Sequence, residues 1–419
     1  MPLRLKLRTC WLSRMLRGWR LDRNPLRRRS DRVETVAVDA AFGRVAAKPV
    51  VARGPVPPFA RATWDGYALR SRDVRLASRR RPRALRIVGE VFAEQTYRGT
   101  LGPGEAVAVA TGGAIPAGAD ALEIFEEVER DGPAVVVRGP VRSGARIAAI
   151  GSDVPRGTVL VRRGEVIGPA ALGAVAASGV ARLTVYAKPI VAVVPNGNEL
   201  VPPGGRLRPG QIFESNNAAL VAFLVACGCE PRPRPPLRDD APTIERALRG
   251  ALRSSDLVLA TGGSSVGEHD HLPRLFPRIG RLLFHGVAVR PGKPTLAASS
   301  GPKLLVGLPG HPTSCLLNMH WLVMPVLRRL ARLSGPGWAA RPARLAGPSL
   351  TPTPGLATVV PLEVRGALVR STFRGSSATR SLRAAEAFTI LPPGRRPVRT
   401  GSRLRVFVLD PPLGPPGSG

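Results

Sequence analysis

The chain has 419 residues, of which 44% are hydrophobic and 22% are charged, and its formal net charge at pH 7 is +33. This length suits roughly two to four domains, each able to bury a core of its own. Because no apolar run approaches the length of about 18 residues that a membrane helix needs, we expect no membrane span. The arginine-rich amino terminus also lacks an apolar segment and a cleavage site, so we expect no signal peptide.

The positive charge comes almost entirely from arginine, because only five of the 62 basic residues are lysines. A charge of this size raises the prospect of nucleic acid or an anionic membrane surface as a partner. The arginines are spread along the whole chain, however, and the aromatic residues, at 5%, do not cluster with them, which is poor for stacking on bases. We therefore interpret the charge as a solvated surface that also attracts small anionic substrates.

The cysteines Cys10, Cys227, Cys229 and Cys315 form no CxxC pair. Their spacing predicts neither a disulfide framework nor a structural zinc site. We expect the protein in a reducing compartment, with the cytoplasm as the default.

The first part of the chain predicts short elements joined by turns. An amphipathic helix is expected over residues 9–21, and a helix followed by a strand over residues 33–52. Residues 85–137 alternate polar and apolar side chains between Gly and Pro turns, which predicts a small β-rich module of short strands. An apolar helix over residues 169–178 ends at Gly179.

From Lys188 the pattern changes to strands that alternate with helices, which predicts a parallel sheet covered on both faces. One helix is capped by Ser215 or Asn216 and stops at Gly228, and the next has Pro242 in its first turn. A further strand, a turn and a long helix follow. A stretch rich in Pro and Gly then precedes a last all-β segment, and the carboxyl-terminal tail is expected to be disordered.

Three glycine-rich turns follow predicted strands of this sheet: PNGNEL, TGGSSVGEHD and GLPGHPTS. The carboxyl ends of the strands form the ligand-binding edge of such a sheet, and Gly lets backbone N–H groups turn inward to hold an anion. Each turn alone is weak evidence, because Gly also serves turns through its freedom at positive φ. Together they predict a pocket for a phosphate-bearing ligand, and the lack of a GxxxxGK sequence followed by Ser or Thr disfavours a P-loop hydrolase.

Acidic residues are scarce, at 29, so those in turns stand out. Asp65, Glu199, Asp239 and Asp270 all lie beside Gly, Pro or a predicted helix start. Hard oxygen ligands of this kind suit Mg²⁺ bridged to phosphate, whereas capping and turn hydrogen bonds are the common structural use of the same residues. Both interpretations remain open from the residues alone.

Six segments occur in one order along the chain: WDGYALRSRD, GEAVAVATGGAIPAGADAL, PNGNELVPPGGRLRPGQIFESN, TGGSSVGEHD, HGVAVRPGKP and GLPGHPTS. In sequence, order and spacing they resemble the MoeA family, which includes the carboxyl-terminal part of gephyrin. The resemblance covers about residues 35–410 and implies a molybdopterin molybdenumtransferase. Such an enzyme uses Mg²⁺, inserts molybdate into adenylylated molybdopterin and releases AMP, a step of molybdenum cofactor biosynthesis.

The resemblance also implies a multidomain α/β plus β fold and a homodimer. An active cleft is implied between the α/β domain of one subunit and the β-rich module of its partner, and a molybdopterin adenylyltransferase is the implied protein partner. The implied domains are an N-terminal helical and elongated domain from residues 1–55 and 140–187, an inserted β-rich module over 56–139, a three-layer α/β/α molybdopterin-binding domain over 188–334, and a C-terminal β-barrel over 335–412.

The family motifs carry site residues over to this sequence. Glu199 and Asp270 are the implied Mg²⁺ ligands, and Arg290 and Lys293 are the implied cations near the oxyanion. The implied catalytic residues are Asp65, Thr111, Glu199, Asp239, Asp270 and Lys293. The implied substrate-binding residues are Gly262, Gly263, Ser265, Gly267, Arg290, Pro309 and Pro312.

This chain departs from the family pattern in several motifs. Trp64 replaces Met, Asn196-Gly197-Asn198 replaces Thr-Gly-Asp, Arg290 replaces Lys, and His311 replaces Asn. Arg290 cannot lose its proton, which excludes a role for a neutral amine there. His311 can titrate or only hydrogen-bond, and we favour the hydrogen bond.

Two other functions stay open beside molybdate insertion. Tungstate is nearly identical to molybdate in size and charge, so the sequence does not distinguish a tungstate-inserting paralogue. A non-catalytic molybdopterin-binding scaffold is the other alternative, although every acidic residue carried over to the site is retained.

Overall fold

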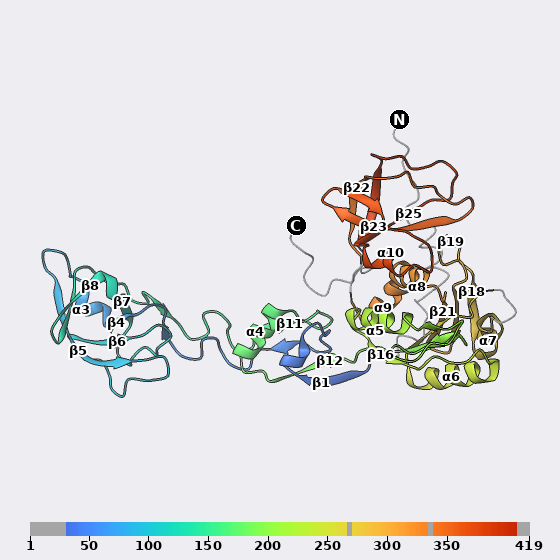
Figure 1. Ribbon diagram of the computed structural model, residues 1–419. Helices are drawn as coiled ribbons and strands as arrows, with labels where there is room; N and C mark the ends of the chain where they lie inside the picture. Colours follow the sequence, from blue (N-terminus) through green and yellow to red (C-terminus); the bar gives the residue numbers. More distant parts are fainter. Residues whose placement is uncertain (1–30, 266–269, 334–337, 409–419) are drawn as a thin grey trace. The chain divides into compact units, whose positions relative to one another are not determined.

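The computed structural model describes residues 31–265, 270–333 and 338–408, and its internal contacts divide the chain into two compact units (Figure 1). One unit is Thr35–Val185, and the other joins Met1–Glu34 to Tyr186–Gly419. The helix predicted over residues 9–21 and the carboxyl-terminal tail lie outside the described residues. Within the described part of the chain, no helix has the length and apolar character needed to cross a membrane.

A six-stranded sheet forms the main core of the unit Thr35–Val185. Its strand order is β7-β4-β6-β5-β9-β8, with β5 parallel to β6 and the other pairs antiparallel. Its two faces bury separate apolar clusters, one containing Leu85 and the other Val107. The short strands predicted over residues 85–137 are therefore confirmed. The strands are β4 (Gly66–Leu69), β5 (Arg83–Val91), β6 (Glu105–Val109), β7 (Ala121–Ile124), β8 (Val128–Asp131) and β9 (Ala134–Val137).

Short strand pairs and short helices account for the other elements before β13. α4 (Pro169–Ala177) is the predicted apolar helix, and Gly179 follows it at φ +81°. The remaining helical elements are η2 (Asp39–Ala41), α3 (Ser71–Val74) and η3 (Phe125–Glu127). The strand pairs are β1 (Val33–Ala37) with β12 (Arg182–Tyr186), β2 (Val50–Val51) with β11 (Val159–Val161), and β3 (Arg61–Ala62) with β10 (Ile147–Ala148).

The helix expected at the start of residues 33–52 is wrong, because this segment begins with strand β1. Val33, Thr35 and Val36 are β-branched, and such side chains favour the extended backbone that pairs with β12. Among the described residues of 1–55 and 140–187, helical structure is limited to η2 and α4. This region is therefore less helical than predicted.

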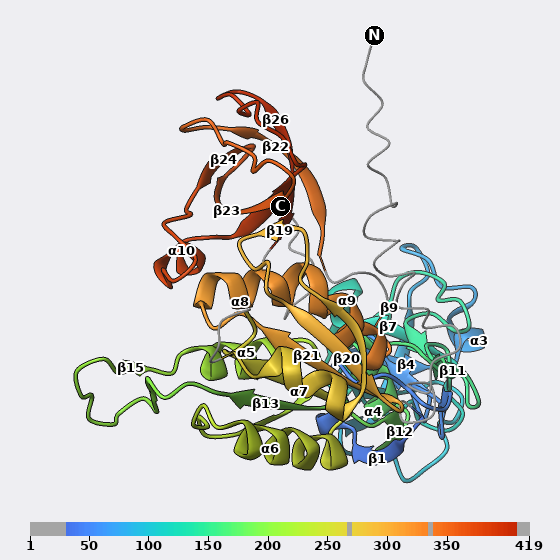
Figure 2. The ribbon, with the colours of Figure 1, turned by 90° about the vertical axis from the view of Figure 1, so that its right-hand side faces the viewer.

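A second six-stranded sheet lies in the unit that contains Tyr186–Gly419. Its order is β16-β13-β17-β21-β20-β18, and β16, β13, β17 and β21 are parallel, as the alternation of strands and helices predicts. Beside it, β14 (Leu200–Val201) and β15 (Ile212–Phe213) pair in a small arm (Figure 2). The strands of the sheet are β13 (Ile190–Pro195), β16 (Glu230–Pro233), β17 (Leu257–Thr261), β18 (Arg281–His285), β20 (Leu296–Ser300) and β21 (Lys303–Leu308).

Helices cover both faces of this sheet (Figure 2). Along β17, Leu257 and Leu259 belong to the cluster of α5, α8 and α9, whereas Val258 and Ala260 belong to the cluster of α6 and α7. This alternation follows from the period of two along a strand. The three-layer α/β/α arrangement is therefore confirmed. The helices are α5 (Asn216–Ala226), α6 (Ala241–Ser254), α7 (Leu272–Ile279), α8 (Pro312–Asn318) and α9 (Met324–Leu330).

Two strands depart from the predicted parallel sheet. β20 is antiparallel to β21, and β18 is antiparallel to β20. Only Gly301 and Pro302 separate β20 from β21, with Gly301 at φ +58°. A connection this short can join only antiparallel strands, because a parallel pair needs a long crossover.

The long helix predicted after β21 changes its winding part-way along. α8 is followed by a π-helical turn, η4 (Met319–Val323), and then by α9. Pro325 lies in the first turn of α9 and has no N–H to donate to the carbonyl four residues earlier, which favours a wider turn in front of it. The π turn places His320 and Trp321 in the buried core.

The carboxyl-terminal strands form a closed barrel, as predicted (Figure 2). The order β23-β24-β22-β26-β25 returns to β23, and side chains such as Leu362 and Val406 fill the interior. β19 (Val289–Arg290) precedes the barrel in sequence and pairs in parallel with β23, which brings Arg290 to the edge of the barrel. The small helix α10 (Arg380–Arg383) precedes β25. The barrel strands are β22 (Ala340–Leu345), β23 (Ala357–Arg365), β24 (Leu368–Ser371), β25 (Ala387–Leu391) and β26 (Arg403–Val408).

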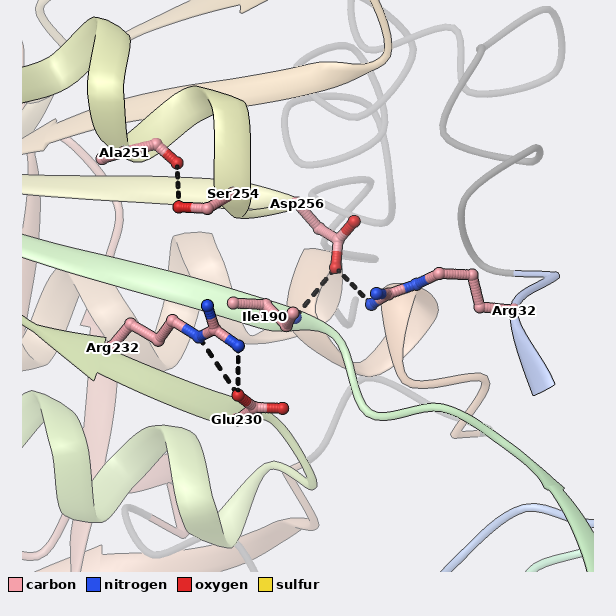
Figure 3. A network of polar contacts seen from close by, with 7 residues as sticks. All are labelled: Arg32, Ile190, Glu230, Arg232, Ala251, Ser254 and Asp256. Carbon is pink, nitrogen blue, oxygen red and sulfur yellow. Dashed lines mark hydrogen bonds and ion pairs between the residues drawn. The ribbon is translucent and has the colours of Figure 1, made fainter. Parts of the chain in front are cut away.

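Asp256 fixes β13 against β17 at the start of both strands (Figure 3). Its carboxylate accepts a hydrogen bond from the backbone N of Ile190 at 2.8 Å and one from the guanidinium of Arg32 at 3.4 Å. Asp256 is buried, so these donors compensate a charge whose burial would otherwise be costly. Two of the glycine-rich turns lie at the opposite ends of these two strands, and the third follows β21.

Candidate functional site

Three glycine-rich turns meet at the carboxyl ends of β13, β17 and β21. The backbone N of Asn196 donates to Thr261 O at 2.9 Å, and that of Gly262 donates to Leu308 O at 3.3 Å. A Cβ on Gly262 would lie 2.3 Å from Asn196 O, and one on Gly310 would lie 3.4 Å from the Cα of Gly262. Gly262 also has φ +86°, so both its backbone and its surroundings require glycine. The turns thus share one edge of the sheet, as the sequence predicts.

Two of the predicted acidic residues lie at this edge. The Asp239 carboxylate accepts hydrogen bonds from Asn196 Nδ2 at 3.3 Å and from the backbone N of Asn198 at 3.1 Å. The Glu199 carboxylate lies against Gly197, where a Cβ would be 2.7 Å from Oε2. Asp239 therefore orders the turn after β13. The Glu199 carboxylate occupies space that a side chain at position 197 would need.

The turn after β17 leads toward α7. Gly263 O accepts a hydrogen bond from Leu272 N at 3.1 Å, which brings the start of α7 back to the end of β17. Ser265 is exposed and Asp270 is half-buried, while Gly267 lies outside the described residues. The predicted phosphate-binding residues that are described therefore lie on one strand-to-helix connection.

A cavity of about 480 Å³ lies where the sheet edge faces the barrel. Arg290, Lys293 and Ser314 contribute charged and polar groups to its lining, and Pro309 contributes an apolar wall. No Asp or Glu is among the described residues of the lining. Two cations without a carboxylate beside them in the wall make this cavity suitable for an anion. Pro312, by contrast, begins α8 and is not in the lining.

Buried Asn318 holds the loop that carries both cations. Its Nδ2 donates to Gly292 O at 2.9 Å and to Thr295 Oγ1 at 2.6 Å, and its Oδ1 accepts from Trp321 Nε1 at 2.8 Å. Gly292 has φ +102°, and a Cβ there would lie 2.4 Å from Asn318 Nδ2. Asn318 is not predictable as a site residue from the sequence, because an asparagine within a helix gives no local sign of a partner in a distant loop.

The turn after β21 is tied to a loop of the barrel. His311 Nδ1 and Ser376 Oγ lie 2.9 Å apart and share a hydrogen bond. The backbone N of Thr313 donates to Ser376 O at 3.0 Å, and Thr313 Oγ1 donates to Ala378 O at 2.8 Å. Both His311 and Ser376 line the cavity. His311 makes a hydrogen bond, as we favoured, and its role stays a prediction, whereas Ser376 was not foreseen because its segment reaches the site only through the folded barrel.

Asp65 and Thr111 lie in the other compact unit. The Asp65 carboxylate accepts two hydrogen bonds at Oδ1, from Thr111 N at 2.6 Å and from Thr111 Oγ1 at 2.8 Å. These two bonds, the backbone one more strongly, lower the pKa of the Asp65 carboxyl below its usual value. Trp64 beside it is exposed. The pair therefore presents an ionised carboxylate at the surface of its unit.

Among the described residues, no group of three or more His, Cys, Asp or Glu side chains could hold a metal ion. Mg²⁺ commonly takes one or two protein carboxylates and completes its shell with phosphate and water, so this does not conflict with the predicted pair Glu199 and Asp270. The described cysteines are free and buried, and burial raises the pKa of the Cys227 thiol to about 12. Cysteine thiolates are therefore not available as ligands in this part of the chain.

Two family models match the chain, "MoeA N-terminal region (domain I and II)" over residues 14–179 and "Probable molybdopterin binding domain" over residues 192–329. The molybdopterin molybdenumtransferase of Bacillus subtilis is 31% identical over 385 residues, which cover 90% of each chain. The chain belongs to the MoeA family. The molybdopterin molybdenumtransferase of Staphylococcus aureus is 30% identical over 390 residues, covering 90% of this chain and 91% of its own.

Solved structures agree with the membership in the MoeA family. A crystal structure of the molybdopterin biosynthesis MoeA protein from Pyrococcus horikoshii has a TM-score of 0.80 and 32% identity, and it covers 94% of this chain and 98% of its own. The molybdopterin-binding match contains the three strand-end turns together with Arg290, Lys293 and Asn318. The MoeA N-terminal match contains Asp65 and Thr111.

Proposed function

We propose that this MoeA-family chain is a molybdopterin molybdenumtransferase, which inserts molybdate into adenylylated molybdopterin and releases AMP. The observation that carries this proposal is the cavity at the sheet edge, whose lining holds Arg290 and Lys293 and no described carboxylate. Its cations suit a tetrahedral dianion, and the adjoining glycine-rich turns suit the phosphates of a nucleotide-linked pterin. Curated relatives with the same domains carry this enzyme name.

In the cavity, the protein would act by placement and electrostatics. Arg290 and Lys293 would hold the oxyanion, because two cations on one short loop attract a dianion both before and after the metal changes ligands. Exchange of oxygen for dithiolene sulfur expels oxide as water, so the leaving oxygen needs protons. Each oxide takes two protons to leave as water: Lys293 can supply one, and a dithiolene thiol can release the other as its sulfur binds the metal, whereas Arg290 keeps its own. Asn318 would keep both cations in place through its bonds to Gly292 and Thr295.

The turn after β17 would bind the phosphate region of the substrate. Gly262 and Gly263 both have positive φ, at +86° and +57°, which turns their backbone groups in a way that other residues rarely allow. Ser265 is exposed and can add a hydroxyl donor, and Gly267 follows it in the sequence. This arrangement would hold the pyrophosphate next to the oxyanion cavity.

We propose Glu199 and Asp270 as the residues that hold Mg²⁺. Support for Glu199 comes from Gly197, which leaves space beside the Glu199 carboxylate that a Cβ would fill. Asn196 Oδ1 in the same turn is buried without a hydrogen-bond partner, so its lone pairs are available as a further oxygen ligand for a metal ion. When bound, Mg²⁺ would neutralise the pyrophosphate and make AMP a better leaving group. Asp239 would support these ligands through its bonds to Asn196 and Asn198.

We further propose a homodimer in which Asp65 and Thr111 of each subunit act on substrate held by its partner. Mixing two inactive variants, Asp65→Asn and Lys293→Leu, tests this arrangement. Random exchange makes half of the dimers mixed, and each mixed dimer would have one intact site, so about a quarter of wild-type activity should return. No recovery in mixtures shown to exchange subunits would place Asp65 with its own subunit's site.

The assay for the proposed activity uses purified protein, adenylylated molybdopterin, Mg²⁺ and molybdate. We expect AMP release coupled to formation of active cofactor, and loss of both in Asp65→Ala, Glu199→Ala and Asp270→Ala with the fold retained. A parallel reaction with tungstate separates the two metal specificities. Tight binding of substrate without AMP release would instead indicate a scaffold.

We also propose a cytoplasmic protein that receives its substrate from a molybdopterin adenylyltransferase. The free, buried thiols of Cys227, Cys229 and Cys315 are consistent with a reducing compartment. Adenylylated molybdopterin is the product that an adenylyltransferase would make. Association of the two purified proteins, measured by sedimentation, tests the partnership.

A further inference from the structure

A hydrogen bond between two side chains in the wall of the cavity links the α/β sheet edge to the barrel. His311 lies in the turn after β21 and Ser376 lies in the loop before α10, and both line the cavity with Arg290 and Lys293. His311 Nδ1 and Ser376 Oγ are 2.9 Å apart. The oxyanion that the cations attract would therefore meet this hydroxyl.

The direction of that hydrogen bond decides what Ser376 offers to an anion. A hydroxyl has one proton. If His311 Nδ1 accepted it, the proton would point at the imidazole and the Ser376 oxygen would present lone pairs to the anion. If Nδ1 carries hydrogen and donates to Oγ, the hydroxyl proton is free for the anion. An anion held by Arg290 and Lys293 favours the second arrangement, because it gains a donor in place of a repulsive contact.

The rest of the contact between the two segments is independent of the His311 ring. Thr313 N donates to Ser376 O at 3.0 Å, and Thr313 Oγ1 donates to Ala378 O at 2.8 Å. The Ser381 hydroxyl accepts from Arg374 N at 3.0 Å on the other side of Ser376. Other hydrogen bonds therefore hold the backbone of the loop on both sides of Ser376. The loop does not depend on the ring of His311, whose hydrogen bond orients the hydroxyl of Ser376.

We infer that His311 is a positioning residue, which donates from Nδ1 to Ser376 so that the Ser376 hydroxyl donates to the bound oxyanion. This inference rests on the proposed oxyanion site in the same cavity. It assigns the imidazole a task that a side-chain amide can also perform, since the amide N–H of an asparagine can donate as Nδ1–H does. His311 acts here through its hydrogen bond and does not need to contact the oxyanion.

The test measures binding of molybdate alone to the full chain by titration calorimetry. We expect His311→Leu and Ser376→Ala each to weaken binding about tenfold, the effect of one hydrogen bond to a charged group. The double variant should also be about tenfold weaker, because both changes remove the same interaction. His311→Asn should bind within about twofold of wild type, since it restores a donor. His285→Leu is the matched control, because His285 is exposed on β18 and does not line the cavity.

A spectroscopic measurement adds a signal that a loss of packing alone would not change. In protein labelled with ¹⁵N-histidine, we expect molybdate to shift the His311 ring toward the form that carries hydrogen on Nδ1. Wild-type affinity in His311→Leu, additive losses in the double variant, or binding by His311→Asn as weak as by His311→Leu would each overturn the inference. Circular dichroism and thermal melting confirm that each variant is folded, and Ser376→Ala tests the same bond from the other side.

The cation variants separate this inference from the proposal on which it rests. If Arg290→Leu and Lys293→Leu lose molybdate binding while His311→Leu keeps it, the oxyanion site stands and the role of His311 does not. If wild-type protein binds no molybdate, or if both cation variants bind it normally, the oxyanion site is misplaced and the inference about His311 fails with it.

Discussion

Thr111 donates both its backbone N–H and its hydroxyl to a single oxygen, Oδ1 of Asp65. The two residues are far apart in sequence, and the fold brings the turn before β4 next to the turn after β6. Because the carboxyl is exposed, these two donors, and not burial or a nearby charge, are what lower its pKa.

The first prediction concerns the pKa of Asp65. Thr111→Val removes the hydroxyl donor and keeps the backbone N–H, so the pKa of the Asp65 carboxyl should rise but stay below its usual value, since the backbone bond is the larger cause. Carbon-detected NMR titration of the Asp side chains measures this shift. Thr111→Ser keeps the hydroxyl and should leave the titration as in wild type. An unchanged titration in Thr111→Val would show that the hydroxyl does not act on Asp65.

The second prediction concerns the packing of the strand-end turns. Gly262→Ala and Gly204→Ala introduce the same methyl group at nearly the same φ, +86° and +88°. Gly204 has nothing within 4 Å of the new Cβ, whereas at Gly262 it would lie 2.3 Å from Asn196 O. We expect Gly204→Ala to lower the free energy of unfolding by at most about 1 kcal/mol and Gly262→Ala by more than about 2 kcal/mol. Denaturant titrations of both variants measure the difference, and equal losses would contradict the close approach.

Local sequence patterns predicted much of the α/β part, for identifiable reasons. Buried strands such as β17 read as continuous apolar runs, and the glycines after them mark turns that only the parallel arrangement brings together. The strands before β13 were partly mistaken. β1 was expected as a helix, because a short segment with mixed polarity shows no clear period and its pairing with β12 depends on residues far along the chain.

The candidate site was predictable where a residue's role depends on its own turn, and not where it depends on tertiary contact. Gly262 and Glu199 stand in motifs whose composition already indicates a ligand-binding edge. Asn318 looks like a helical residue and Ser376 like a loop residue until the fold places them beside the cation loop and His311. The antiparallel orientation of β20 follows from the two-residue turn of Gly301 and Pro302. This turn is visible in the sequence, but the alternation of strands and helices around it favours a parallel strand.

The third prediction concerns Asn318. Asn318→Ala removes three buried hydrogen bonds, two that its Nδ2 donates to Gly292 O and Thr295 Oγ1 and one that its Oδ1 accepts from Trp321 Nε1. We expect the free energy of unfolding to fall by about 1.5–4.5 kcal/mol, at about 0.5–1.5 kcal/mol for each of the three lost hydrogen bonds. Molybdate binding should weaken as well, because the loop with both cations loses its anchor. Asn217→Ala is the matched control, since Asn217 donates to Arg234 O outside the cavity lining, and it should leave molybdate binding unchanged.

The fourth prediction concerns buried His320 and the stability of the α/β core toward acid. Its ring packs edge-on against Phe223, with the centroids 4.6 Å apart, and burial lowers the pKa of His320 to about 3. The unfolded chain takes up a proton at this histidine near its usual pKa of about 6.5, while the folded chain stays neutral. Between these two values the unfolded state binds more protons, so stability is complete above about pH 6.5 and is lost as the pH falls toward 3. The loss from this residue should be about 1.4 kcal/mol per pH unit below pH 6.

His320→Leu should remove this dependence of stability on pH, and His285→Leu, the control, should retain it. Urea unfolding at pH 7, 6 and 5 would measure both. If His320→Leu unfolds with the pH dependence of wild type, the acid sensitivity of the core comes from other groups.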